Sequence, residues 1–242
     1  YQTETFVIAD YRTLTLPSLG AIQYGQQPLD AIDIDRVEVV RGPAGALYGP
    51  GVEAGIVHFI SKDPFKHKGT SISIGGGTQN QLQFAFRHAG TTFDKKFGYK
   101  FTGFYRQATE FEIDTTDPVA AARLAAYPTQ VTSSLDPTQV ISDIVPDYGV
   151  QSFNFSASGE YKFSQNTSLI GAAGYGQYSG MIRVAQGDGF TRAARPFAQL
   201  RFKSGNFFAQ TFWSKQMGGD GQNWFYATGR TLLTNIDQVE AQ

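Results

Sequence analysis

Few residues in this chain are of the types that do chemistry, and their spacing limits what that chemistry could be. The 242 residues contain no cysteine and three histidines, His58, His67 and His88, which stand apart in the sequence. A zinc site needs several closely spaced nitrogen or sulfur ligands, so we expect no metal centre of this kind. Serines and carboxylates form no nucleophile–base pattern, and the sequence therefore predicts neither catalytic residues nor an enzyme.

A glycine-rich segment is the second place where chemistry could occur. Between two β-branched runs lie Gly42, Gly45, Gly49, Gly51 and Gly55. A phosphate-binding loop would need a following Lys-Ser or Lys-Thr pair, or a strand–glycine–helix context, and neither is present. The glycines instead predict tight turns between a strand at 37–41 and a second strand at 56–61.

A third candidate is the acidic segment 107–149. Its carboxylates are Glu110, Glu112, Asp114, Asp117, Asp136, Asp143 and Asp147. An oxygen-rich cluster could bind calcium or a cationic group, which makes loop-bound calcium the one cofactor that we consider. No EF-hand-like spacing occurs, so a solvated outer loop is the favoured alternative. Within this segment Asp117, Pro118 and the later Pro128 predict a short helix at 119–126.

After residue 69, apolar and polar residues alternate along the chain. This pattern predicts β-strands, and those strands must position the acidic segment. Phe153 and Phe155, for example, alternate with Ser152 and Asn154. Successive strand residues point to opposite faces, so each such strand has one apolar and one polar face. The strands reach about ten residues, which is enough to cross a bilayer when tilted.

The connections between these strands also form a pattern. We expect short turns at 77–80, 91–96, 164–167 and 203–206, and long loops at 107–149, 180–194 and 217–230. Tight turns at one end and long loops at the other are typical of outer-membrane barrels. The alternative is a soluble β-sandwich, whose strands also have one apolar face but are usually shorter. We therefore expect an all-β membrane protein built on an antiparallel transmembrane β-barrel.

The number of strands bears on what the chain represents. Residues 69–242 accommodate about eight strands at about 22 residues each. A complete eight-stranded barrel has room only for its own side chains or one small ligand. A barrel of about 22 strands would need roughly 480 residues, and its lumen is wide enough to require a plug. The first 68 residues distinguish these possibilities.

Three consecutive segments carry a family resemblance: Asp35–Pro43 (DRVEVVRGP), Ala46–Gly51 (ALYGPG) and Gly55–Lys62 (GIVHFISK). They resemble the end of the plug domain of TonB-dependent outer-membrane receptors. The chain departs from the usual pattern at Ala54, where a second glycine is common, and at His58, where Asn is common. The resemblance implies that residues 1–68 are the C-terminal part of an α+β plug inside the lumen. Residues 69–242 would then be the N-terminal part of a barrel that has about 22 strands when complete.

The resemblance also implies a function and partners. A receptor of this family takes up a scarce, bulky nutrient, such as a ferric siderophore, cobalamin or a glycan, across the outer membrane of a Gram-negative bacterium. The implied partners are the coupling protein TonB with its ExbB–ExbD motor, outer-membrane lipid and lipopolysaccharide, and surface lipoproteins or other assembly partners. Nucleic acid is not expected, because 20 Lys and Arg residues nearly balance 21 Asp and Glu residues.

Two sets of site residues follow from this resemblance. Contacts between plug and barrel are expected from Arg36, Glu38, Arg41 and Glu53, although these could also be solvated or locally paired charges. The ligand is expected to meet the plug apex and outer loops at Ala44, Leu47, Tyr48, Tyr148, Trp224 and Tyr226. The loop aromatics could stack on a sugar or an aromatic chelate, or belong to the interfacial aromatic girdle.

Two other functions remain open at this point. The barrel could be a structural or docking subunit of a cell-surface assembly, or a small outer-membrane barrel enzyme. The sequence does not identify the transported ligand, because loops and the plug apex select it.

Overall fold

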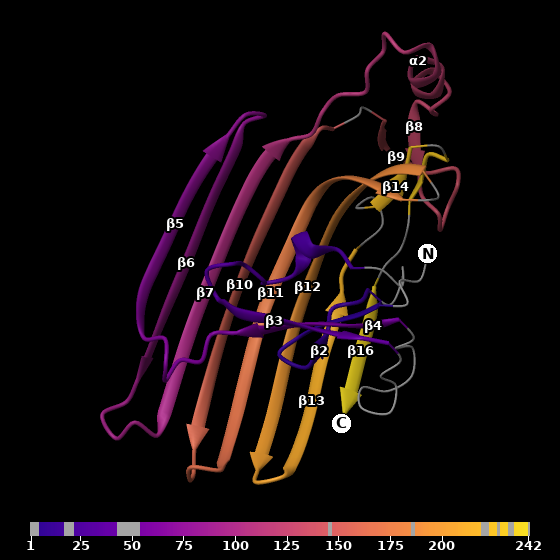
Figure 1. The fold of residues 1–242 in the computed structure, drawn as a ribbon. Helices are drawn as coiled ribbons and strands as arrows, with labels where there is room; N and C mark the ends of the chain where they lie inside the picture. The colour runs from indigo at the N-terminus through magenta and orange to yellow at the C-terminus, as the bar shows by residue number, and fades with distance from the viewer. Residues whose placement is uncertain are drawn as a thin grey trace.

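The chain forms two β-sheets (Figure 1). The computed structural model describes residues 5–16, 22–42, 54–144, 147–184, 187–218, 223–226, 228–231 and 235–241. We call the described residues up to 68 the small domain and the sheet that begins at Gly69 the wall. The two sheets share no strand. They therefore meet through side chains and loops alone.

The small domain is a four-stranded sheet in the order β2-β1-β4-β3. Its elements are β1 (Thr5–Ala9), β2 (Arg12–Thr13), the 3-10 helix η1 (Tyr24–Gln26), β3 (Ile34–Arg41) and β4 (Gly55–Ser61). The predicted strands at 37–41 and 56–61 are thus confirmed. β1 runs parallel to β4, whereas the other pairs are antiparallel. A core of Ile8 and Ile56, with Phe6 against it, joins the two central strands.

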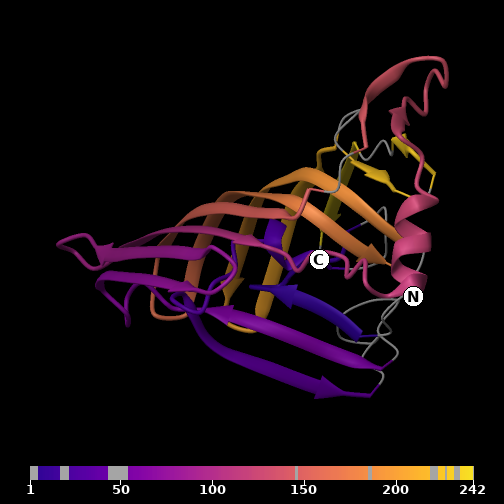
Figure 2. The same ribbon diagram turned by 90° about the horizontal axis from the view of Figure 1, so that it is seen from above.

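Among the described residues, the wall is built on eight antiparallel strands of six to 18 residues, in agreement with the prediction of about eight. These are β5 (Gly69–Gly77), β6 (Gln81–Thr91), β7 (Phe97–Thr109), β10 (Gly149–Lys162), β11 (Thr167–Val184), β12 (Gly187–Ser204), β13 (Phe207–Gln216) and β16 (Ile236–Ala241). Among the described residues β5 pairs with β6 alone and β16 with β13 alone. The eight strands therefore form an open sheet, which curves around the small domain on its concave side (Figure 2).

Two long loops carry further elements at the upper end of the wall (Figure 1). The first contains α2 (Pro118–Ala125), β8 (Gln130–Thr132) and β9 (Val140–Asp143); the second contains β14 (Asn223–Phe225) and β15 (Arg230–Thr231). The predicted helix is confirmed, and the Asp117 side chain caps it by accepting a 2.9 Å hydrogen bond from Val119 N. The four short strands pair onward from β12 and extend the sheet. The long loops are therefore folded against the wall.

The prediction of a long loop at 180–194 is wrong. β11 and β12 continue as an antiparallel pair through Met181↔Phe190 to Val184↔Gly187. The glycines and polar residues of this stretch resemble turn chemistry, which explains the misplacement. Tertiary packing overrides that local signal, because Met181 and Phe190 form a buried cluster with Tyr226.

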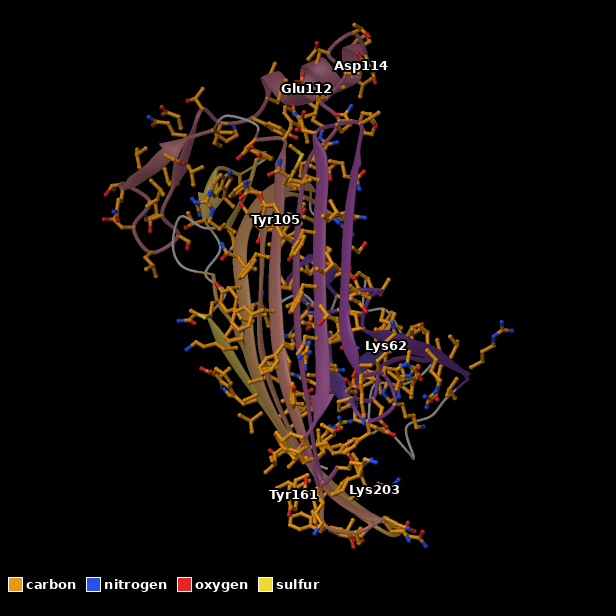
Figure 3. All side chains as sticks on the ribbon, turned by 90° about the vertical axis from the view of Figure 1, so that its left-hand side faces the viewer. Lys62, Tyr105, Glu112, Asp114, Tyr161 and Lys203 are labelled. Atoms are coloured by element: carbon orange, nitrogen blue, oxygen red, sulfur yellow. The ribbon has the colours of Figure 1, made fainter. Side chains whose placement is uncertain are left out.

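The wall buries its polar face and exposes its apolar face, which is the reverse of a soluble sheet. In β10, Ser152 and Asn154 are buried, whereas Phe153 and Phe155 are each 48% exposed. The polar face lies against the small domain, since Ser152 and Asn154 contact it. The apolar face points outward along the height of the wall, where Tyr105 and Tyr161 mark its upper and lower parts (Figure 3). A β-sandwich buries its apolar faces, so that alternative is excluded.

None of the helices in the described part of the chain is long and apolar enough to span a membrane.

Candidate functional site

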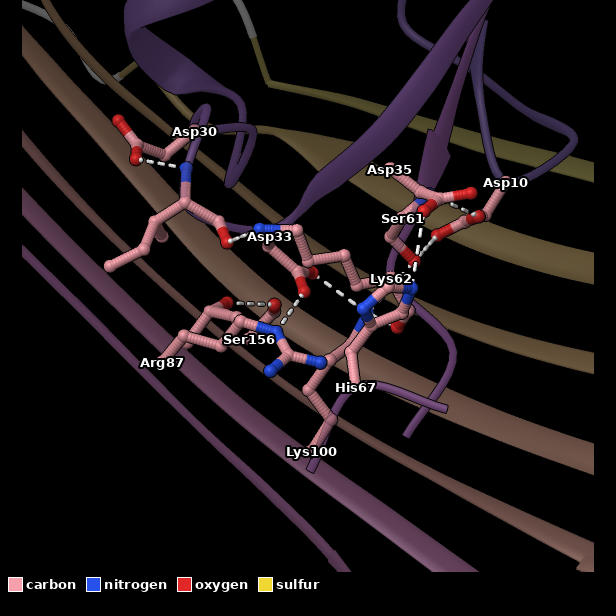
Figure 4. A network of polar contacts seen from close by, with 12 residues as sticks. Asp10, Asp30, Asp33, Asp35, Ser61, Lys62, His67, Arg87, Lys100 and Ser156 are labelled. Atoms are coloured by element: carbon pink, nitrogen blue, oxygen red, sulfur yellow. Dashed lines mark hydrogen bonds and ion pairs between the residues drawn. The ribbon is translucent and has the colours of Figure 1, made fainter. Parts of the chain in front are cut away.

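The contact between the small domain and the wall holds most of the buried charge, and Asp33 is its first anchor. Asp33 precedes β3, and its two carboxylate oxygens each bind a cation: Oδ1 lies 2.7 Å from Arg87 Nε and Oδ2 lies 2.7 Å from Lys100 Nζ (Figure 4). Arg87 on β6 and Lys100 on β7 share the concave face, and both side chains are almost fully buried. A buried charge is stable only when it is paired, so these three residues depend on one another.

Lys100 extends this anchor to the end of β4. Besides Asp33, its ammonium donates to Ser61 Oγ at 2.8 Å and to the Lys62 carbonyl at 3.0 Å. These three acceptors use all three hydrogens of the ammonium group. Ser61 in turn donates from Oγ to Asp10 Oδ2 at 2.6 Å, and Figure 4 shows the continuous network. One wall side chain therefore connects to three separate segments of the small domain.

Asp10 is held ionised within this network. Burial opposes its ionisation, but the positive charges of Arg201 and Lys100 and two hydrogen bonds from Ser61 outweigh that effect and lower the pKa of its carboxyl. The carboxylate therefore remains a permanent acceptor at the interface at neutral pH.

The hairpin between β1 and β2 makes the second anchor. Its turn residues Asp10 and Tyr11 both have left-handed backbones, with φ of 46° and 69°. This turn presents two carbonyls to the wall: Asp10 O accepts from Gln199 Nε2 and Tyr11 O from Gln210 Nε2, each at 2.8 Å. The two glutamines also bond each other at 2.7 Å. The anchor on β12 and β13 is thus made of neutral groups.

Arg195 strengthens the same side of the interface. This β12 residue is 1% exposed, and its guanidinium donates to the carbonyls of Leu14 at 2.6 Å and Thr15 at 3.1 Å. It also donates to Ser214 Oγ on β13 at 3.3 Å. The chain leaving β2 is therefore fixed to the wall through its backbone, independently of its side-chain sequence.

The third anchor is a close backbone approach at η1. Gly25 O accepts from Ser152 Oγ at 2.6 Å and from Asn154 Nδ2 at 3.2 Å. A Cβ on Gly176 would lie 2.0 Å from Gln26 O, and a Cβ on Gly25 would lie 2.3 Å from the Tyr178 ring. Glycine at both positions is what lets η1 approach β10 and β11 this closely.

A cavity of about 250 Å³ lies between the charged anchor and the hairpin. Among the residues that line it are Asp10, Asp33, Ser61, Lys100 and Arg201. This volume has room for several water molecules at about 30 Å³ each. The charged groups of the interface therefore line a space that is large enough to hold water.

Three of the four predicted plug–barrel charges lie in the described residues. Arg36 pairs with Asp35 at 3.1 Å and with Glu38 at 2.8 Å, within the small domain. Arg41 is exposed at the end of β3, and Glu53 lies outside the described residues. Their contact with a barrel wall stays a prediction. The sequence analysis did not identify Asp33, Lys100 or the hairpin as contact residues. On the wall side, the available sequence signal was that charged and amide residues occupy the polar face of the alternating strands.

The predicted ligand residues fall into two groups. Ala44, Leu47 and Tyr48 lie outside the described residues. Tyr148, Trp224 and Tyr226 pack in or against the cluster of Met181 and Phe190. Tyr226 is 1% exposed, and Trp224 stacks on Phe190 with ring centroids 4.6 Å apart. In this structure the three aromatics hold the upper loops together, and their role toward a ligand stays a prediction.

An ion pair also holds the loop that contains α2 against β12. Arg123 of α2 pairs with Asp188 Oδ2 at 2.7 Å, and Tyr127 OH donates to the same oxygen at 3.1 Å. Within the described residues, no three His, Asp or Glu side chains are grouped to hold a metal ion. Calcium binding by this loop stays a prediction.

Comparisons with known proteins agree with this arrangement, although no protein-family model matches the chain. The vitamin B12 transporter BtuB of Vibrio vulnificus is 24% identical over 223 residues, 91% of this chain and 32% of that protein. Among solved structures, the copper transporter OprC has a TM-score of 0.60 at 18% identity, over 89% of this chain and 30% of that one. The FrpB iron transporter from Neisseria meningitidis also has a TM-score of 0.60, at 13% identity over 89% of this chain and 32% of that one. The chain thus spans about a third of the length of these relatives.

Proposed function

Because the homologues and structural neighbours of this chain are TonB-dependent outer-membrane receptors, we propose that the protein actively takes up a scarce, bulky nutrient across the outer membrane. These homologues are transporters and receptors of Gram-negative bacteria, not enzymes. In this proposal the small domain is part of a plug and the wall is part of the surrounding barrel.

The observation that carries the proposal is the inverted wall with a separate domain on its polar side. Along β10 the outward aromatics run from Phe153 to Tyr161, and Phe163 follows in the next turn. Ten residues of strand span about 33 Å, and a tilt of about 40° reduces this to about 25 Å. That height matches the apolar band of outer-membrane barrels.

The interface chemistry supports a plug that can move. Its anchors are hydrogen bonds and ion pairs beside a cavity lined in part by charged residues. Water can replace these bonds when the domain shifts. An apolar interface would have no hydrogen bonds that water could replace. From the likeness to TonB-dependent receptors we infer that the energy for release comes from the inner membrane through TonB and its ExbB–ExbD motor.

The relatives do not select one substrate. Their names refer to vitamin B12, ferrichrome, copper and ferric enterobactin. The proposal therefore names only the class of substrate, a bulky nutrient such as a ferric siderophore, cobalamin or a glycan.

The test is uptake by cells that carry the complete receptor and lack other receptors for the same nutrient. Radiolabelled cobalamin, ferric catecholate and ferric hydroxamate chelates, and oligosaccharides are offered in turn. We expect one class to accumulate only when TonB is present, while binding at the cell surface persists without TonB. Accumulation that does not depend on TonB would contradict the proposal.

A further inference from the structure

The concave face of the wall carries a group of basic residues at its lower end, away from the long loops. Gln199 bonds the hairpin of the small domain, and Arg201 and Lys203 follow on the same face of β12, because residues two apart in a strand share a face. Lys162 lies on the same face of β10 as Asn154, which contacts η1. Figure 3 shows Lys203 at the lower end of the wall. The three cations therefore lie on the side of the small domain, between its contacts and the lower turns.

The strand register places these residues in two adjacent rows. In the lower row Lys162 stands opposite Ser168 of β11, and Ser168 stands opposite Lys203. One row above, the same three strands carry Glu160 on β10 and Arg201 on β12. Adjacent strands are about 4.8 Å apart, so the backbones of the two lysines are about 10 Å apart with a hydroxyl residue between them.

Both rows line a cavity of about 770 Å³, which we call the lower cavity. Tyr11 of the hairpin and Phe208 of β13 belong to the same lining. The turns at 164–167 and 205–206 add residues with hydroxyl and amide side chains. Ligand pockets commonly have about 300–1,000 Å³, so the lower cavity has room for a bulky small molecule.

The charges in the lining of the lower cavity do not cancel. Lys162, Arg201 and Lys203 are accompanied by one carboxylate, Glu160, which leaves a surplus of two positive charges. Among the described residues, none of these four groups takes part in an ion pair. Lys162 Nζ lies 3.6 Å from the centroid of the Phe65 ring, a contact that leaves its charge without a counter-charge.

Arg201 also lines the cavity beside the charged anchor, so it lies between the two cavities. Its Nε is shielded from solvent and has no hydrogen-bond partner in the described part of the chain, and its guanidinium carbon is 5.8 Å from the centroid of the Tyr11 ring. Asp10 interacts with its charge, but Asp10 does not line the lower cavity, and its carboxylate accepts hydrogen bonds from Ser61. Arg201 therefore keeps an unused donor beside the lower cavity.

We propose that the lower cavity binds a nutrient with several carboxylate groups as it leaves towards the periplasm, an inference that rests on the proposed uptake function. The tight turns of outer-membrane barrels face the periplasm, which places this cavity on the exit side. Ammonium and guanidinium groups form charge-assisted hydrogen bonds with carboxylates, and hydroxyls and amides bind other polar atoms. Cations spread over about 10 Å fit an anion with several charged groups better than one small ion. A neutral glycan would leave these cations without a counter-charge.

The experiment measures binding to the complete receptor in non-ionic detergent by isothermal titration calorimetry at low salt. The probe is citrate, and its neutral trimethyl ester is the uncharged comparison. We expect Lys203→Gln to weaken citrate binding about fivefold, and Lys162→Gln combined with Lys203→Gln to weaken it more than about tenfold. Arg192→Gln removes a cation from the opposite end of β12 and should bind citrate as the wild type does. The ester should bind all these proteins weakly and equally.

Three results would overturn the inference. Equal citrate binding by the wild type and the double lysine variant would show that the lower cavity does not hold the anion. Inorganic phosphate that binds as tightly as citrate would show a site for a single small ion. A receptor that accumulates only a neutral oligosaccharide or cobalamin, and does so only with TonB, would refute this inference and leave the proposed function intact.

Discussion

At the scale of single residues, two glycines determine how closely the small domain approaches the wall. Gly25 belongs to η1 and Gly176 belongs to β11. A methyl group on Gly25 would collide with the Tyr178 ring of the wall, and one on Gly176 would collide with Gln26 O of the small domain. The nearest atoms to a Cβ at Gly176 are Gln26 O at 2.0 Å and Asn154 Oδ1 at 2.3 Å. Gln26 O is a backbone atom and cannot rotate away, so the whole of η1 would have to move.

The first prediction is therefore that Gly176→Ala loosens the small domain. Overpacking of this kind costs about 1–3 kcal/mol, which should lower the melting temperature by a few degrees. Amide hydrogen exchange at Tyr24–Gln26 should accelerate, because η1 loses its close contact with β10 and β11. The matched control is Gly171→Ala on the same strand, where an added Cβ meets nothing within 4 Å. Equal exchange in the two variants would contradict the steric argument.

The second prediction concerns His58 and pH. His58 is 2% exposed, and its Nε2 accepts a 3.2 Å hydrogen bond from Tyr11 N. Burial lowers its pKa below the ordinary 6.5, although the charges of Asp10 and Glu38 partly oppose the shift. The unfolded chain then binds this proton more tightly than the folded chain does. The stability that His58 contributes is complete above pH 6.5 and is lost as the pH falls towards the folded pKa.

Thermal unfolding between about pH 7.5 and 5.5 measures this effect. The wild type should lose stability on acidification, and His58→Gln should show a smaller slope. His88→Gln, on the outward face of β6, is the control. Asp10 also has a lowered pKa, but its contribution is lost only below its ordinary value of 3.8, so it does not enter this window. Identical slopes in wild type and His58→Gln would refute the role assigned to His58.

At the scale of elements, local signals identified some segments and failed for others. The helix α2 was predictable because Asp117 and Pro118 act within one turn of the chain. The strands were predictable because alternation is a local pattern. The β11–β12 hairpin was not, since its extension to Val184↔Gly187 depends on packing of Met181 and Phe190 against Tyr226, far away in sequence.

The third prediction tests the cap of α2. Asp117→Ala removes the acceptor for Val119 N, and loss of such a cap costs about 1 kcal/mol. The helix is exposed and packs little, so amide exchange should rise across Pro118–Ala125 while the wall strands keep their protection. Glu112→Ala removes a carboxylate from the same loop and should leave exchange in the helix unchanged. Increased exchange in both variants would indicate a general charge effect and not capping.

At the scale of the whole molecule, the strands of the two sheets could be predicted, but the contact between the sheets could not. Asp33 and Arg87 are 54 residues apart, and Asp10 and Gln199 are 189 apart. No local pattern specifies which pairs of such residues meet, because that depends on where the domain sits on the concave face. Two of the four predicted charges, Arg36 and Glu38, pair with each other within β3. Pairing with a sequence neighbour requires no tertiary arrangement.

The small domain is held at three places along the wall, and this division leads to the last prediction. Asp33 joins it to β6 and β7, Gly25 to β10, and the hairpin carbonyls to β12 and β13. Asp33→Asn would leave two buried cations without their carboxylate, a change that costs about 3–5 kcal/mol. The remaining anchors should nevertheless keep the domain seated.

Combining Asp33→Asn with Gly176→Ala should release the domain on one side, because only the hairpin and Arg195 contacts on β12 and β13 then remain intact. In cells that carry the complete receptor, we expect the double variant to admit a large hydrophilic antibiotic that each single variant excludes. Lys215→Met combined with Gly171→Ala changes a partly exposed ion pair and an open glycine, and should exclude the antibiotic. A permeable Asp33→Asn single variant would show that the charged anchor alone seats the domain. An impermeable double variant would show that the hairpin and Arg195 contacts seat the domain without help from the other two anchors.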